Sequence, residues 1–183
     1  MYILLLSLRL LLAIPIGISI YQGNDLQALV LFIFAGLSDV LGYLEDLRFL
    51  GEDIDLLRRQ GRLDSGFLDY LSEFRFTGSV WAMNEVSVFL ANEPVIEVTA
   101  PMIEAQIVET YLLNQVTLQT TLASKAARVI SAARGRTVVD FGARRTHGLD
   151  AANKLARVGY MVGLAGTSNV MAGSLWDLSL IHI

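Results

Sequence analysis

The pattern of apolar and polar positions divides the chain into a long apolar start and a mixed remainder. Residues 1–44 carry only three charged side chains, Arg9, Asp25 and Asp39, among mostly aliphatic and aromatic neighbours. A polar turn at residues 22–25 splits this stretch into two apolar runs, each shorter than the ~20 residues that cross a bilayer as a helix. The pattern predicts a hydrophobic helical segment, either a buried helical pair or two short membrane helices.

From residue 45 onward the pattern is typical of a globular protein. Helical periodicity, acidic residues at a helix start and Gly61 as a stop signal indicate short helices. The predicted helical stretches cover residues 45–49, 52–58 and 65–71. Three apolar runs separated by polar residues then predict a small β layer. The predicted strands cover residues 79–83, 86–89 and 95–99, and we expect Trp81 of the first strand in the core.

The second half of the chain begins with a long helical pattern and continues with alternating strands and helices. Pro101 suits a first helical turn, and apolar residues recur at helical spacing until Gly135. The elements predicted after it are a strand at 137–141, a turn at 142–148, a helix at 150–160, a strand at 161–165 and a turn at 166–169. This alternation is typical of βα units, in which ligands gather at the C-terminal ends of parallel strands.

Composition narrows the class of protein. With 54% apolar and 17% charged residues in 183, the chain has ample material for a buried core. It contains no cysteine, which excludes disulfides, thiolate metal sites and a cysteine nucleophile. A net charge of -4 conceals a basic stretch, because residues 111–160 contain eight Lys or Arg and two Asp. Such a surplus serves either a solvated helix surface or an anionic ligand.

Two predicted turns could carry chemistry. Arg144 and Arg145 follow the 137–141 strand, next to Gly142, which lets the backbone approach a ligand. The guanidinium fork suits phosphate and carboxylate, although surface arginines also pair with acids on helices. The turn at 166–169 adds hydroxyl and N–H groups of the kind that hold a phosphate or a small polar ring.

Other motifs carry no function. The triplet Asp140–Gly142 matches a kinase motif by chance, because no glycine-rich loop or His-Arg-Asp segment precedes it. His147 and His182, the two histidines of the chain, lack the spacing of metal ligands. We expect no metal site.

From about Ala35 to Gly173 the chain resembles the nicotinate phosphoribosyltransferases. The segments that carry the resemblance are 43–49, 67–71, 74–78, 91–94, 97–101, 112–115, 125–128, 140–145 and 166–173. The resemblance implies an α/β fold, in which an α+β N-terminal domain leads into an incomplete, irregular α/β barrel of the type II phosphoribosyltransferase kind. The implied divisions are a hydrophobic helical segment foreign to the family (1–34), the N-terminal α/β domain (35–100), a long helix with the first barrel strands (101–173) and an unmatched tail (174–183).

The family reaction serves NAD biosynthesis and salvage. It transfers phosphoribose from phosphoribosyl pyrophosphate to the ring nitrogen of nicotinate, with ATP hydrolysis as the driving reaction and magnesium as the ion. The resemblance implies a cytoplasmic homodimer that binds no nucleic acid and has no prosthetic group. Carried over by position, Phe141 faces the pyridine ring, Arg144 supported by Arg145 meets phosphate or carboxylate oxygens, and Ser168 lies at the edge of the ring. The implied substrate-binding set is Phe141, Gly142, Arg144, Arg145, Thr167 and Ser168, with no catalytic residue among them.

Two parts of the chain depart from the family. Residues 1–34 lack its Thr-Asp-x-Tyr segment, and residues 1–44 are similar to the start of a CDP-alcohol phosphatidyltransferase. That second signature, Asp-x-x-Asp-Gly, is broken after Asp39, because Gly42 stands where the next aspartate belongs. The resemblance ends at Gly173, before the family's phosphorylatable histidine, so we expect a fragment with little activity of its own. The alternatives are a membrane-embedded phosphatidyltransferase remnant, with membrane contact only through residues 1–34, and a non-catalytic interaction fragment.

Overall fold

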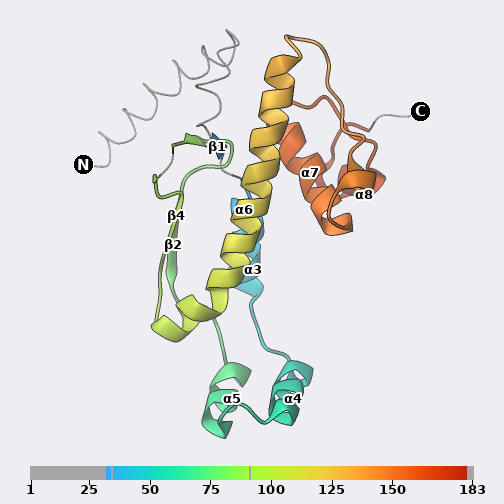
Figure 1. The fold of residues 1–183 in the computed structure, drawn as a ribbon. Helices are drawn as coiled ribbons and strands as arrows, with labels where there is room; N and C mark the ends of the chain where they lie inside the picture. Colours follow the sequence, from blue (N-terminus) through green and yellow to red (C-terminus); the bar gives the residue numbers. More distant parts are fainter. Residues whose placement is uncertain (1–31, 34, 91, 181–183) are drawn as a thin grey trace.

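The computed structural model describes residues 32–33, 35–90 and 92–180, and it has a mixed helix and sheet architecture (Figure 1). Its regular strands form two separate two-stranded antiparallel sheets. In one, β1 (Phe32–Ile33) pairs with β3 (Val88–Phe89), and in the other, β2 (Ser79–Ala82) pairs with β4 (Ile96–Thr99). The predicted strands therefore exist, although they do not form one layer.

The helices have the order predicted by the sequence. They are α3 (Leu37–Asp46), α4 (Gly51–Gln60), α5 (Ser65–Ser72), α6 (Met102–Ala132), α7 (Leu149–Met161) and α8 (Val170–Trp176). Local capping fixes several ends: the Asp64 carboxylate accepts the N–H of Gly66 at the start of α5, and Gly61 ends α4 in the left-handed conformation with φ 64°. The helix expected to continue over 45–49 instead ends at Asp46, because Leu47 adopts an extended conformation.

Helix α6 is the centre of the fold. In Figure 1 it runs between the β2–β4 sheet on one side and α7 and α8 on the other. Val108 and Leu112 of α6 form a buried cluster with Val40 and Leu44 of α3. Because α6 packs against elements on several sides, it links the first half of the described chain to the last third. No helix among residues 32–33, 35–90 and 92–180 is long and apolar enough to span a bilayer. The hydrophobic segment predicted over residues 1–34 falls almost entirely outside these residues.

The β2–β4 sheet corrects the prediction for Trp81. Val80 and Val98 are paired across the sheet and pack against the α3–α6 cluster. Side chains alternate between the faces of a strand, so Trp81 and its partner Glu97 lie on the opposite face. Trp81 is 37% exposed, and the expectation that it belongs to the core is wrong.

The last third holds short parallel pairings in place of the two predicted strands. Asp140 forms a parallel bridge with Thr167, which forms another with Leu180. Ala165 N–H donates to the Val138 carbonyl at 2.9 Å, extending the first pairing by one step. The strand predicted at 137–141 is thus reduced to a short pairing that ends at Asp140.

The strand predicted at 161–165 is displaced toward the C-terminus. Met161 is the last residue of α7, and Gly163 reverses the chain with φ 115° before pairing begins at Ala165. The apolar run 161–165 thus contains both the end of α7 and the start of the pairing segment. A hydrophobic pattern does not distinguish the end of a helix from a short buried strand.

Candidate functional site

The first candidate turn starts directly after the backbone pairing of Asp140. Asp140 Oδ1 accepts the N–H of Gly142 at 2.7 Å, which folds the chain back on itself. A short 3-10 helix, η1 (Ala143–Arg145), follows and is closed by a bond from the Arg145 N–H to the Gly142 carbonyl at 2.8 Å. Several large side chains of this turn reach solvent, among them Phe141, which is 46% exposed, Arg144 and Arg145.

The second candidate turn lies beside the first because the two backbones pair at Asp140 and Thr167. Ser168 N–H donates to the Asp140 carbonyl at 2.9 Å, and the Asp140 N–H donates to the Gly166 carbonyl at the same distance. The predicted residues on either side of this pairing are therefore brought to one edge of the fold. Ser168 itself is half-buried.

Thr167 faces the protein interior and is only 1% exposed. Its hydroxyl donates to Asp140 Oδ2 at 2.8 Å and accepts the N–H of Asn169 at 3.0 Å. The hydroxyl proton is thus used within the protein. The geometry gives Thr167 a supporting position behind the turn, whereas Ser168 remains partly accessible.

Two asparagines tie the second turn to the neighbouring helices. Asn169 caps α8, because its Oδ1 accepts the N–H of Ala172 at 3.2 Å. Its Nδ2 donates to Oδ1 of Asn153 in α7 at 3.0 Å. Sequence reasoning missed Asp140, Asn153 and Asn169 as supports of the site. The signal available was an Asp or Asn placed directly before a turn or a helix start, a position where these side chains bind backbone N–H groups.

The charged groups of the first turn are its two arginines. Within the part of the chain that the structure describes, neither Arg144 nor Arg145 forms an ion pair. The nearby acid in the first turn of α7, Asp150, instead binds Lys154 at 2.6 Å. The interpretation of these arginines as surface partners of helix acids is therefore not supported. Two exposed guanidinium groups beside a tight turn suit an anionic ligand.

A partly buried polar network connects α7, the helix between the two turns, to the start of α3. Arg157 of α7 donates to Glu85 Oε2 at 2.8 Å and to Ser38 Oγ at 2.7 Å. Glu85 Oε1 in turn accepts the N–H groups of Gly36 and Leu37 at the start of α3, at 2.8 and 3.0 Å. Burial alone raises the pKa of Glu85, but the hydrogen bond and charge of Arg157 and the two N–H groups outweigh it, so its pKa lies below the ordinary 4.5.

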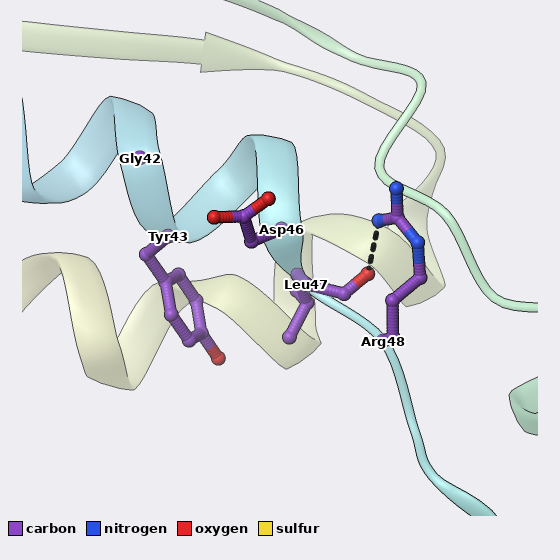
Figure 2. A pocket seen from close by; sticks show the side chains of 5 residues that line it. All are labelled: Gly42, Tyr43, Asp46, Leu47 and Arg48. Atoms are coloured by element: carbon purple, nitrogen blue, oxygen red, sulfur yellow. Dashed lines mark hydrogen bonds between the residues drawn. The ribbon is translucent and has the colours of Figure 1, made fainter.

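A surface hollow of about 310 Å³ lies away from both turns. It is lined by Gly42, Tyr43, Asp46, Leu47 and Arg48. Figure 2 shows that the Arg48 guanidinium folds back onto the Leu47 carbonyl, at 2.7 Å, and does not meet Asp46. The Tyr43 ring stacks on Tyr111 with 3.6 Å between ring centroids. The polar groups of this hollow do not converge on a shared point, and we assign it no ligand.

Comparison with known proteins identifies the family. The nicotinate phosphoribosyltransferase N-terminal domain matches residues 24–117, so the match begins before Ala35, the residue at which the resemblance of the sequence starts. Nicotinate phosphoribosyltransferase pncB2 of Mycobacterium tuberculosis is 57% identical over 144 residues, which are 79% of this chain and 31% of that protein. The nicotinate phosphoribosyltransferase of Bacillus subtilis is 40% identical over 146 residues, or 80% of this chain and 30% of that protein.

A solved structure agrees with the sequence comparison. The crystal structure of human nicotinic acid phosphoribosyltransferase superposes with a TM-score of 0.75 and 27% identity, covering 84% of this chain and 32% of the human chain. The chain thus spans about a third of the length of the curated relatives that it matches. The predicted family is confirmed: this chain belongs to the nicotinate phosphoribosyltransferase family.

Proposed function

We propose that this chain supplies part of the substrate site of a nicotinate phosphoribosyltransferase, and that the two paired turns bind the phosphoribosyl and pyridine substrates. Family membership supports the reaction class, and one observation carries the assignment to these turns. The pairing of Asp140 with Thr167 places the exposed Arg144 and Arg145 beside the second turn (residues 166–169), which we call the Ser168 turn. Among the described residues, neither arginine forms an ion pair.

The parallel pairings support a second part of the proposal, that this region begins an α/β barrel. The order of segments is pairing strand, α7, pairing strand, α8 and a third pairing segment at Leu180. Parallel neighbours joined by helices are the repeating unit of such barrels. The substrate turns then occupy the C-terminal ends of the first two strands, the end at which barrel enzymes bind their ligands.

The chemistry of the reaction explains why arginine is useful at this position. A bond forms between the nicotinate ring nitrogen and C1 of the ribose, while the bond from C1 to pyrophosphate breaks and its electron pair leaves with pyrophosphate. Arg144 and Arg145 would hold phosphate oxygens of phosphoribosyl pyrophosphate or the nicotinate carboxylate through charge-assisted hydrogen bonds. Phe141 would cover the pyridine ring, and Ser168 would contact its edge.

ATP and magnesium enter the proposal only through the family. Among residues 32–33, 35–90 and 92–180, no group of three or more acidic or histidine side chains is placed to hold a metal ion. We therefore assign magnesium no ligand in this part of the chain and derive no step through it. The homodimer and the cytoplasmic location likewise stay predictions.

Calorimetric titration with phosphoribosyl pyrophosphate tests the proposal on the 183-residue chain. Arg144→Ala removes one charge-assisted contact of ~1.5–3 kcal/mol, so the affinity should fall by roughly ten- to a hundredfold. Arg62→Ala, a matched loss of an exposed guanidinium outside both turns, should leave the affinity within about twofold. If the wild-type chain binds the ligand and Arg144→Ala binds it equally well, Arg144 is not part of the site.

A further inference from the structure

Asp140 occupies the point at which the two proposed substrate turns meet. It is buried, with 7% of its surface exposed, and each of its polar groups serves one of the turns. Its Oδ1 accepts the N–H of Gly142 at 2.7 Å, in the first turn (residues 142–148), which we call the arginine turn. Its Oδ2 accepts the hydroxyl proton of Thr167 at 2.8 Å. Its backbone carbonyl holds the Ser168 N–H at 2.9 Å.

We infer that Asp140 is a positioning residue, which sets the arginine turn and the Ser168 turn in register for their two substrates. The inference rests on the proposed function, since it assigns the role through Arg144 and Ser168. Its two carboxylate oxygens are directed to Gly142 and Thr167 within the protein, so its role is exerted through the turns. A carboxylate is suited to this task, as it is acceptor-only and both of its partners here are donors.

The surroundings of Gly142 show how closely the carboxylate is fitted. A Cβ at Gly142 would lie 3.0 Å from Asp140 Oδ1 and 3.1 Å from Leu155 Cδ2 of α7. The turn therefore has little room to move relative to the carboxylate or to α7. The φ of Gly142, -84°, is open to any residue, so it is the close approach of these two side chains that favours glycine here.

Thr167 extends the link into α8. Its hydroxyl donates to Asp140 and accepts the N–H of Asn169. Asn169 caps α8 and also donates to Asn153 of α7. A disturbance at Asp140 should consequently reach both turns. A disturbance at Arg144 should stay local to its own contact with the ligand.

Amide hydrogen exchange of the full chain tests the link without any ligand. Asp140→Ala removes both acceptors, so neither the Gly142 N–H nor the Thr167 hydroxyl keeps its partner. Thr167→Val removes the hydroxyl at nearly constant volume and leaves Asp140 in place. We expect both variants to exchange about tenfold faster in residues 141–146 and in residues 168–170, at a retained circular dichroism spectrum. Thr167→Ser keeps the hydroxyl and should exchange like wild type, as should Asp69→Ala, the same chemical change at an exposed site on α5.

A double-mutant cycle with phosphoribosyl pyrophosphate tests the positioning role. Asp140→Ala should weaken binding about tenfold in the wild-type background but by a clearly smaller factor when Arg144 is already alanine, because part of its effect acts through that arginine. Acceleration of exchange in only one turn, or an undiminished loss of affinity in the Arg144→Ala background, would overturn the inference. If wild-type chain binds no phosphoribosyl pyrophosphate, the proposed function of this chain fails, while the exchange result alone still decides whether Asp140 links the two turns.

Discussion

Replacing Glu85 by glutamine should destabilise the protein more than neutralising a charged side chain that is exposed to solvent. Glu85 and Arg157 form the most buried ion pair of the described residues, with side chains that are 16% and 11% exposed. The carboxylate also binds the N–H groups of Gly36 and Leu37. The amide of glutamine keeps one acceptor oxygen for these donors but leaves the Arg157 guanidinium without its counter-charge.

The magnitude follows from the surroundings of the pair. Removing one partner from a fully buried ion pair costs about 3–5 kcal/mol. Here both side chains retain slight access to water, and Arg157 keeps its bond to Ser38, so we expect a loss of about 2–3 kcal/mol. Asp55→Asn, in the exposed Arg58–Asp55 pair of α4, is the control and should cost less than about 0.5 kcal/mol.

Urea unfolding followed by circular dichroism measures these changes. Arg157→Met should be comparably destabilising, and the double variant should be more stable than the sum of the two losses, with a coupling of at least about 1 kcal/mol. Strict additivity, or a loss below about 1 kcal/mol for Glu85→Gln, would refute the view that this pair fixes α7 against the start of α3.

The pH dependence of the same variant gives an independent check. The pKa of Glu85 is lower in the folded protein than its ordinary 4.5, so its stabilising contribution is fully present above that value. It is lost as the pH falls through the lowered folded pKa. The stability difference between wild type and Glu85→Gln should therefore be constant near neutral pH and shrink below about pH 4.5. A difference that persists undiminished at pH 3 would show that charge is not its source.

Two further changes probe the packing of the N-terminal part. Phe74→Ala should cost about 3–5 kcal/mol in urea unfolding, because Phe74 is 2% exposed and meets Phe49 and Tyr70 edge to face; a loss under about 1.5 kcal/mol would contradict this packing. Gly78→Ala should cost about 1–3 kcal/mol, since its Cβ would lie 2.6 Å from Ala100 Cβ and 2.7 Å from the Thr99 carbonyl oxygen. Its control is Gly42→Ala, where the Cβ meets nothing within 4 Å inside α3 and the melting temperature should rise.

The sequence by itself determined the elements whose causes are local. Helix α6 begins after Pro101 and ends before Arg134 and Gly135, which have left-handed backbone conformations. Asp64 caps α5 by accepting the N–H of Gly66, two positions along the chain. Such bonds join residues within one turn, so composition and spacing are sufficient to indicate them. The family was likewise readable, because many short motifs occur in the same order as in its members. The two candidate turns were found by the same route, as glycine, arginine and hydroxyl residues after apolar runs.

The tertiary structure alone decided which distant residues meet. Asp140 and Thr167 are 27 positions apart, and Glu85 and Arg157 are 72 apart, so no local pattern joins them. The same holds for Trp81, whose burial depends on which face of β2 has a helix to cover it. Local propensity specifies a backbone conformation, whereas burial and pairing depend on the neighbours that the completed fold supplies. That is why Thr167, predicted from its position in a motif to face a substrate, turns its hydroxyl inward to Asp140.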